Sequence, residues 1–467
     1  MIDNFYMLTW NWLTESPLLA TATEVAAKSD AEEGTLVLAG VLLSLVIIYF
    51  ASKLGGEICS RINLPPVLGE LVGGVLIGIS AFRLLVFPET STAEDSLIIN
   101  MLQSTAGLPP EAASSVFAAQ SEVISLLSEL GVIILLFEIG LESDLKELIR
   151  VGPIAAVVAV VGVVAPFVAG TLGLVYIFGT PIVPAIFAGA ALTATSIGIT
   201  AKVLAELGQL SSEEGQIIIG AAVLDDILGI VVLAVVASLV KTGEIQVTNI
   251  VYLIISAAVF LIGSILLGRL VSPFIVGLVN EMKTRGEVLI TGLVFAFSLS
   301  YIATAIHLEG ILGAFAAGLI LAETEKRKEL EEQVIPVADI LVPIFFVCVG
   351  AKTDLSVLNP AVPSNREGLI IATFLILVAI LGKVITGFTV FGNPDLNKLA
   401  IGVGMIPRGE VGLVFAGVGS ASGALSEATE AAIIVMVIST TFIAPPLLRL
   451  VFKEDENLAQ SVDKVRE

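Results

Sequence analysis

Long apolar runs recur along most of this chain, and residues 151–201 carry no charged side chain at all. An α-helix needs about 20 consecutive apolar residues to cross the hydrocarbon of a bilayer. Charged residues make up 14% of the chain, whereas soluble domains contain about 25%. The sequence therefore predicts an all-α polytopic membrane protein.

Thirteen such runs lie between polar, proline or glycine punctuation, and GTPIVP at 179–184 separates two of them. The ninth run is short. We expect one transmembrane helix in each of residues 35–53, 65–84, 121–140, 151–178, 183–206, 214–240, 249–270, 287–306, 309–322, 335–351, 367–390, 398–420 and 429–451.

The distribution of Lys and Arg predicts which side of the membrane each loop faces, because cytoplasmic loops carry an excess of both. With thirteen crossings, sixteen of the 23 basic residues fall on one side, five fall on the other and two lie within spans. This bias predicts an external or lumenal N-terminus and a cytoplasmic C-terminus. The first charged residue of the chain is acidic, Asp3, whereas a signal peptide begins with basic residues. We therefore interpret residues 1–34 as an external arm, with a cleaved leader as the alternative.

Two stretches in the second half of the chain resemble two stretches in the first half, in the same order. ELVGGVLIG (70–78) resembles GILGAFAAGL (310–319), and LLFEIGLESDL (135–145) resembles FFVCVGAKTDL (345–355). Six helices per copy, with one linker helix between the copies, would make the copies enter the membrane from opposite sides, as in many secondary transporters. The matched residues are Gly73 with Gly313, Gly78 with Gly318, Gly140 with Gly350 and Asp144 with Asp354.

The fifth helix of each copy, at residues 188–208 and 400–419, is polar near its middle. Interrupted helices in matching positions indicate a binding site at the midplane, because broken backbone is tolerated in a membrane only where it lines a cavity. Arg408 and Glu410 can balance the partial charges at the broken helix ends. The polar positions are Thr193, Thr195 and Ser196 in the first helix and Pro407, Arg408, Gly409 and Glu410 in the second.

Asp225 and Asp226 lie in AAVLDDILGIVV (221–232), near the middle of the sixth expected helix. A charged side chain at the bilayer centre costs about 2.5–3.5 kcal/mol, so both are candidates for a functional role. Adjacent helical residues point about 100° apart, so one carboxylate can face a cavity while the other meets a neighbouring helix. We expect Lys383, deep in the eleventh helix, to pair with one of them, since pairing keeps both partners charged. A structural ion pair that only fixes helix packing is the alternative for Lys383.

The other carboxylate, together with Thr195 and backbone carbonyls, would supply the hard oxygen ligands that suit a small alkali cation. Thr193 and Ser196 are further candidate ligands. A carboxylate that holds either a cation or a proton, and never both, is the chemical core of an antiporter. Glu138, near the end of the third helix, either lines the cation path or lies in a helix interface.

The sequence argues against several other classes of protein. A net charge of −21 argues against nucleic acid as a partner, and the absence of a nucleotide-binding motif argues against a cofactor. Cys59 and Cys348 have no metal-ligand spacing. Adjacent aspartates on one helix cannot face each other across a peptide, as an intramembrane aspartyl protease requires. No repeated filter loop supports a cation channel, which stays the less favoured alternative. We therefore expect a transporter and not an enzyme.

Several motifs together resemble the monovalent cation:proton antiporter-2 family. They are GAALTATSIGIT, VLDDILGIVV, the single lysine of the antepenultimate helix and GMIPRGEVGLVFA; LLFEIGLE and LPPVLGELVGGVLIG are especially similar to cyanobacterial sodium/proton antiporters. The resemblance covers residues 35–450 and implies a thirteen-helix inverted-repeat fold with crossed broken helices, usually assembled as a homodimer. It also implies that Asp226 binds Na+, that Asp225 pairs with Lys383, and that Thr195 lies beside Asp226.

The same resemblance implies a dimer domain and a mobile core domain, each built from both repeats. We expect residues 1–34 as an external N-terminal arm, 35–140 as dimer-domain helices of repeat 1, 150–240 as core-domain helices of repeat 1, 249–270 as the linker helix, 287–351 as dimer-domain helices of repeat 2, 367–452 as core-domain helices of repeat 2, and 453–467 as a cytoplasmic tail.

These observations predict a Na+/H+ antiporter of the plasma or thylakoid membrane, with a role in pH homeostasis. Asp226 and the Asp225–Lys383 pair offer two protonatable routes against one cation site, which favours electrogenic exchange. Potassium/proton exchange on the same fold is the alternative, and Li+ is a further possible substrate, because sequence does not reveal the size of the cavity.

Overall fold

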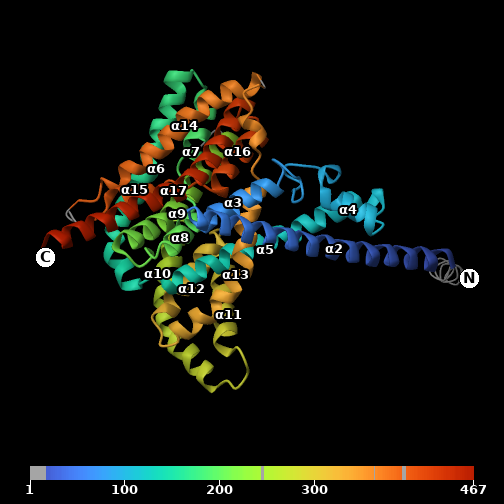
Figure 1. Cartoon of the computed structure of the whole chain (residues 1–467), viewed down its shortest axis with the longest axis horizontal. Coiled ribbons are helices and arrows are strands. Elements are labelled where there is room, and N and C mark those ends of the chain that lie inside the picture. Colours follow the sequence, from blue (N-terminus) through green and yellow to red (C-terminus); the bar gives the residue numbers. More distant parts are fainter. Residues whose placement is uncertain (1–16, 243–246, 362, 392–395, 467) are drawn as a thin grey trace, which may run out of the picture.

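The computed structural model describes residues 17–242, 247–361, 363–391 and 396–466, and every element in these ranges is a helix (Figure 1). The elements are α2 (Pro17–Arg61), α3 (Pro66–Ile77), η1 (Ala93–Asp95), α4 (Leu97–Thr105), η2 (Pro110–Ala112), α5 (Ala113–Glu142), α6 (Leu145–Phe178), α7 (Ile182–Ala191), α8 (Ile197–Glu206), α9 (Glu213–Thr242), α10 (Val247–Glu281), α11 (Glu287–Ala305), α12 (Gly310–Ala322), α13 (Arg327–Ala351), η3 (Leu355–Leu358), α14 (Pro363–Gly387), α15 (Lys398–Gly404), α16 (Glu410–Ala421) and α17 (Glu427–Arg466).

Within the described ranges, nine helices are long and apolar enough to cross a membrane, and each coincides with a predicted run. Two further runs hold the shorter apolar helices α3 and α12, and the remaining two hold the broken pairs α7–α8 and α15–α16. The all-α membrane fold is confirmed. The 12 residues of α3 and the 13 of α12 rise about 20 Å at 1.5 Å per residue, less than the bilayer core. The number of thirteen complete crossings therefore stays a prediction.

Sequence analysis missed a small helical region between α3 and α5. It consists of η1, α4 and η2, whose apolar side chains cluster with Leu36, Val37 and Leu43 in the middle of α2. The nine residues of α4 are too few to form a predicted span. The linker helix also differs, since α10 continues past the predicted end at residue 270 to Glu281, with Pro273 inside it.

The helices pack in two groups. In the first, α5 lies against α12 and α13, α3 lies against α2 and α13, and α11 lies against α12. In the second, α6 lies against α7, α9 and α14, while α17 lies against α14 and α16. In Figure 1, α6, α7, α14 and α16 lie together at the top, and α2 runs out to the right toward the N-terminus.

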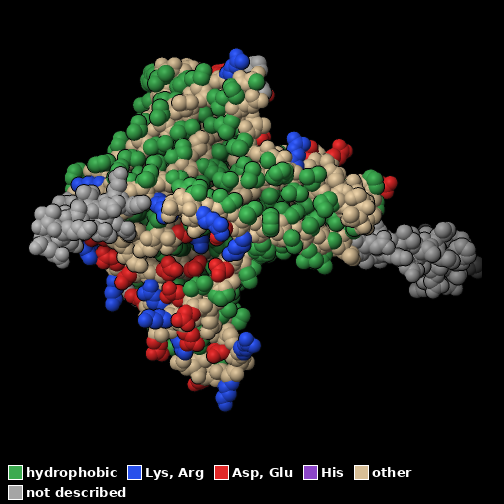
Figure 2. Space-filling view, viewed as in Figure 1, with side chains coloured by type: hydrophobic (Ala, Val, Ile, Leu, Met, Phe, Trp, Pro, Cys, Tyr) green, Lys and Arg blue, Asp and Glu red, His purple; other side chains and the backbone are tan. Residues whose placement is uncertain are grey.

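Apolar side chains cover much of the face seen in Figure 2, over the upper helices and over α2 and α3, whereas Lys, Arg, Asp and Glu gather over its lower part. Exposed residues on α2 such as Leu42, Val46 and Phe50 are more than half exposed. Large exposed apolar surfaces are unfavourable in water, so this distribution fits helices that face lipid.

Glycines let backbones touch where the first group of helices crosses. A Cβ added to Gly74 on α3 would lie 2.9 Å from the Cα of Gly350 on α13, and one added to Gly350 would lie 2.9 Å from the Cα of Gly74. The same holds for α5 and α12. A Cβ added to Gly140 would lie 2.9 Å from the Cα of Gly318, and one added to Gly318 would lie 2.8 Å from the Cα of Gly140.

These two crossings have matching surroundings, and they correct the predicted alignment of the two halves. Gly140 and Gly350 occupy equivalent environments, as predicted, but the environment of Gly318 matches that of Gly74 and not that of Gly78. The predicted match of Gly78 with Gly318 was wrong by one helical turn, because several glycines spaced along α3 allow more than one alignment.

Candidate functional site

Two helices break at the same place in the structure. α7 ends at Ala191 and α8 begins at Ile197, while α15 ends at Gly404 and α16 begins at Glu410. The two breaks touch, since the backbone N–H of Ser196 donates a hydrogen bond to the carbonyl of Pro407 at 2.8 Å. The predicted interruptions are confirmed, and they lie against each other.

Side chains of one broken helix bind the carbonyls that the other leaves free. The hydroxyl of Thr195 donates to the carbonyl of Met405 at 3.2 Å, and that of Thr200 donates to the carbonyl of Gly404 at 2.9 Å. These carbonyls lie at the C-terminal end of α15, where the helix has no amide left to satisfy them. Two hydroxyl donors therefore stabilise the break from the opposite half of the chain.

Arg408 binds carbonyls left free after the end of α7. Its Nη1 donates to the carbonyls of Thr193 and Ala194 at 3.1 and 2.7 Å, and its side chain is fully buried. A helix C-terminus carries partial negative charge, and the guanidinium lies beside these carbonyls. The hydroxyl of Thr441 on α17 fixes Arg408 in turn by donating to its carbonyl at 2.6 Å.

Asp225 and Lys383 form an ion pair. The Nζ of Lys383 lies 3.0 and 3.2 Å from the two carboxylate oxygens of Asp225, and both residues are fully buried. A Cβ at Gly162 on α6 would lie only 3.1 Å from this Nζ, so the glycine leaves room for the lysine. The structure therefore brings together the lysine and the aspartate that sequence analysis expected to pair.

Asp226 points elsewhere. It lines a small cavity of about 10 Å³ together with Thr195, Ser196 and Gly409, and the residue is 4% exposed. A cavity of this size has about the room that one water molecule needs, so it suits a small ion and not an organic ligand. One residue along α9 thus separates a paired carboxylate from one that faces a cavity.

The beginnings of α8 and α16 meet at this cavity. The residues that precede them, Ser196 and Gly409, both line it, and neither helix has a side-chain hydrogen bond capping its N-terminus. Free amides at helix N-termini attract negative charge. Asp226 therefore lies beside two helix N-termini, where a bound cation would find a carboxylate and hydroxyl oxygens together.

Two predicted residues, Thr193 and Glu138, lie away from the cavity. The hydroxyl of Thr193 donates to the carbonyl of Ala190 in its own helix at 2.7 Å, so Thr193 contributes a carbonyl to Arg408 and does not line the cavity. Glu138 on α5 is half-buried and interacts electrostatically with Lys202 on α8 and Asp339 on α13. The side chain of Glu410 lies outside what the structure describes.

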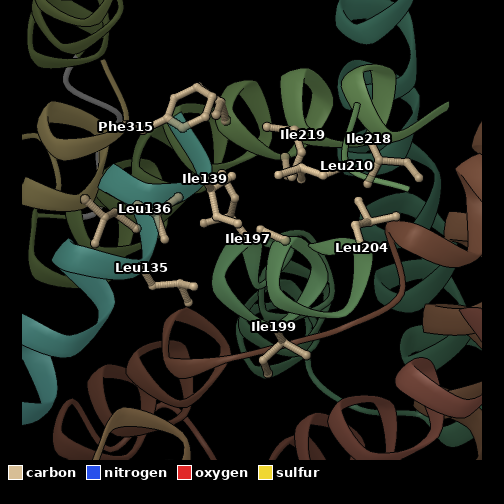
Figure 3. Close-up of a cluster of buried hydrophobic side chains, with 14 of the residues drawn as sticks. Leu135, Leu136, Ile139, Ile197, Ile199, Leu204, Leu210, Ile218, Ile219 and Phe315 are labelled. Carbon is tan, nitrogen blue, oxygen red and sulfur yellow. The ribbon is translucent and has the colours of Figure 1, made fainter. Parts of the chain in front are cut away.

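Apolar side chains pack between α5 and the first broken helix. Leu135, Leu136 and Ile139 of α5 lie beside Ile197 of α8, in a buried apolar cluster that continues to Ile218 and Ile219 of α9 (Figure 3). Ile197 also lines the Asp226 cavity. Ile197 therefore belongs both to this apolar cluster and to the lining of the cavity.

Two residues of the site, Thr200 and Thr441, were not predicted from the sequence. Gly409 was predicted as part of the interruption, but its place in the lining of the cavity was not. Each hydroxyl stands in an otherwise apolar helix, where threonine commonly bonds its own backbone, as Thr373 does with Leu369. No local signal distinguishes Thr200 from Thr373, because the partner of Thr200 lies 204 residues further along the chain.

Comparison with known proteins adds to this geometry. Residues 34–454 match the model of the family described as sodium/hydrogen exchanger, transmembrane. The chain is 75% identical over 438 residues to the high-affinity Na(+)/H(+) antiporter NhaS3 of Synechocystis sp., covering 94% of each protein. It is 32% identical to the Na(+)/H(+)-K(+) antiporter GerN of Bacillus cereus, covering 87% of this chain and 95% of GerN.

A solved structure has a similar fold. The sodium proton antiporter MjNhaP1 from Methanocaldococcus jannaschii superposes with a TM-score of 0.57 at 17% identity, covering 90% of this chain and 99% of the other. At this identity, the likeness concerns the fold alone.

Proposed function

Because this chain belongs to the sodium/hydrogen exchanger family, we propose that it is a secondary active antiporter that exchanges Na+ for protons across a membrane. It is an integral membrane protein and a transporter, not an enzyme. The observation that carries the proposal is the pair of adjacent buried aspartates, one bound by Lys383 and the other facing the cavity between two broken helices.

In the proposed cycle, Asp226 holds the sodium ion, with hydroxyl oxygens of Thr195 and Ser196 beside it. When the cation leaves toward one side of the membrane, the carboxylate takes up a proton, and the protonated site returns to the other side. Cation and proton compete for one group, so neither crosses alone. Asp225 serves as the partner of Lys383 and not as a direct cation ligand.

The proposed movement involves the two groups of helices. The group containing α6, α7, α9, α14, α16 and α17 carries the ion site and moves as the core, against the group built on α3, α5, α12 and α13. We propose that the chain forms a homodimer through the first group, that each group contains helices of both inverted repeats, and that the C-terminus is cytoplasmic, in the plasma or thylakoid membrane. The matching glycine crossings support the repeat.

Potassium/proton exchange is the second candidate, since the name of GerN includes K(+). Dequenching of a pH-sensitive dye in proteoliposomes, upon addition of sodium, lithium or potassium, distinguishes the candidates. We expect sodium to give the largest response at low concentration.

Asp226→Asn tests the proposed site. Losing the charge removes the group shared by cation and proton, so we expect sodium-driven proton flux to fall to the level of empty vesicles. The unfolding temperature in detergent should hold or rise, because the desolvation of a buried charge is relieved. Glu94→Gln, an exposed carboxylate before α4, is the control and should retain full flux. Near-normal exchange by Asp226→Asn would refute the assignment.

A further inference from the structure

We propose that Gly409 sets the size of the cation cavity by leaving room for the side chain of Ser196, and thereby determines which alkali cation the site prefers. The inference rests on the proposed function, because it concerns the cavity that holds the transported ion.

The backbone does not require glycine at position 409. Its φ of −142° lies outside the left-handed region that favours glycine. Space is the constraint, since a Cβ built on Gly409 would lie 2.9 Å from the Oγ and 3.0 Å from the Cβ of Ser196. Real Cβ atoms do not approach other atoms so closely without displacing them, so a side chain at 409 forces Ser196 to move.

Ser196 cannot retreat as a whole. Its backbone N–H is bound to the carbonyl of Pro407, the residue two before Gly409, at 2.8 Å. The two breaks are thus tied together at the point where the new methyl group would arrive. The hydroxyl of Ser196 must rotate instead, and the space beside it is the cavity that Asp226 lines.

The hydroxyl of Ser196 is available for this role. A serine directly before a helix normally accepts a hydrogen bond from an amide of the first turn, but Ser196 makes no such bond with α8. Its side chain is 7% exposed and lines the cavity with Asp226. Gly409 and Ser196 therefore form a contact in which the size of one residue decides the position of a candidate oxygen ligand.

Selectivity among ions of equal charge follows from the size of the cavity and the stiffness of its ligands. Gly409→Ala narrows the cavity and should favour Li+ over Na+, and Na+ over K+. We expect the ratio of the apparent KM for Na+ to that for Li+ to rise about tenfold, equivalent to about 1.4 kcal/mol. Loss of Ser196 should have the opposite effect on the ratio, because it widens the same space.

The experiment measures the apparent KM for Li+, Na+ and K+ by dye dequenching in proteoliposomes, for the wild type, Gly409→Ala, Ser196→Gly and the double variant. Gly417→Ala is the matched control, because Gly417 lies on the same helix and a Cβ there would meet nothing within 4 Å. It should keep the wild-type ratio. The double variant should resemble Ser196→Gly, since no serine hydroxyl is then left for the methyl group to push into the cavity.

The outcomes separate the inference from the proposed function. A wild type without cation-driven proton flux refutes the function itself. An active wild type with an unchanged Li+/Na+/K+ order in Gly409→Ala overturns the role of Gly409. Should Gly409→Ala fail to fold, Ser196→Gly decides alone: a shift toward K+ supports the inference, and a wild-type order overturns it.

Discussion

At the scale of single residues, the two adjacent aspartates show how a helix assigns different chemistry to neighbours. A step of one residue turns the side chain by about 100°, which takes Asp225 to the Nζ of Lys383 and Asp226 to the cavity. Both charges of the pair are fully buried, and each is tolerated because the other is present. We propose that the pair is a second place where protonation changes during the cycle.

Lys383→Gln tests whether this pair moves charge. Without the lysine, Asp226 is the only group that binds and releases a proton during the cycle. Each Na+ should then exchange for one proton and not for two. We expect wild-type flux to respond to a membrane potential clamped with valinomycin, and flux in Lys383→Gln to lose that response.

The double variant Asp225→Asn/Lys383→Gln is the control for stability. Removing one partner of a buried pair costs about 3–5 kcal/mol, because the other charge is left uncompensated. The unfolding temperature should therefore fall in Lys383→Gln and recover in the double variant. Unchanged voltage dependence in Lys383→Gln would remove the lysine from the mechanism, whereas potential-insensitive wild-type exchange would refute electrogenicity.

Sequence alone identified the charged members of the site, because a carboxylate or lysine in an apolar helix is rare and expensive. It did not identify Thr200 or Thr441, because hydroxyls are common in such helices. Nor did it distinguish Thr193 from Ser196, two hydroxyl residues three positions apart. Only the path of the broken backbone places the Thr193 hydroxyl on the carbonyl of Ala190 and Ser196 in the lining of the cavity.

At the scale of elements, the crossing of the broken helices depends on hydrogen bonds between segments about 200 residues apart. The hydroxyl of Thr200 in α8 binds the carbonyl of Gly404 at the end of α15. Long apolar helices were easy to predict because each is fixed by its own composition. The crossing was predictable only as two polar interruptions, since nothing local says that they touch.

Thr200→Val removes one of these braces at nearly constant volume. It leaves the carbonyl of Gly404 without this donor in a buried place, which costs about 1–3 kcal/mol. We expect a lower unfolding temperature in detergent and exchange that is lost at a lower temperature than in the wild type. Thr200→Ser should restore both.

Thr373→Val is the matched control, because the hydroxyl of Thr373 is exposed and binds only its own helix. Its unfolding temperature should match that of the wild type. Equal stability of Thr200→Val and Thr373→Val would show that the Thr200 hydrogen bond does not hold the crossing together.

At the scale of the whole molecule, the two glycine crossings give the first group of helices a frame in which backbones touch directly. The contact of α5 with α12 repeats that of α3 with α13. Sequence predicted that the halves correspond, but it misplaced α3 against α12 by one turn, because only the packed backbones reveal which glycine of α3 makes the contact.

Gly318→Ala tests this frame. The added Cβ would lie against the carbonyl of Phe137 and 2.8 Å from the Cα of Gly140, so α5 and α12 must separate. Forcing atoms into a packed contact costs about 1–3 kcal/mol or more. We expect a lower unfolding temperature and less monodisperse protein in size-exclusion chromatography.

Gly277→Ala serves as the control, since a Cβ at Gly277 meets nothing within 4 Å. Gly74→Ala at the matching crossing should behave like Gly318→Ala. A Gly318→Ala protein as stable and monodisperse as Gly277→Ala would contradict a tight crossing at this point.

The ion pair between Asp225 and Lys383 also has a consequence for biosynthesis. The two partners are 158 residues apart, so α9 emerges from the ribosome long before the lysine of α14 has been translated. During that interval Asp225 and Asp226 must enter the bilayer before Lys383 is present to pair with Asp225, at a cost of about 2.5–3.5 kcal/mol for each carboxylate. The long apolar flanks of α9 are what carry it into the lipid, and the ion site is completed only when the last quarter of the chain arrives.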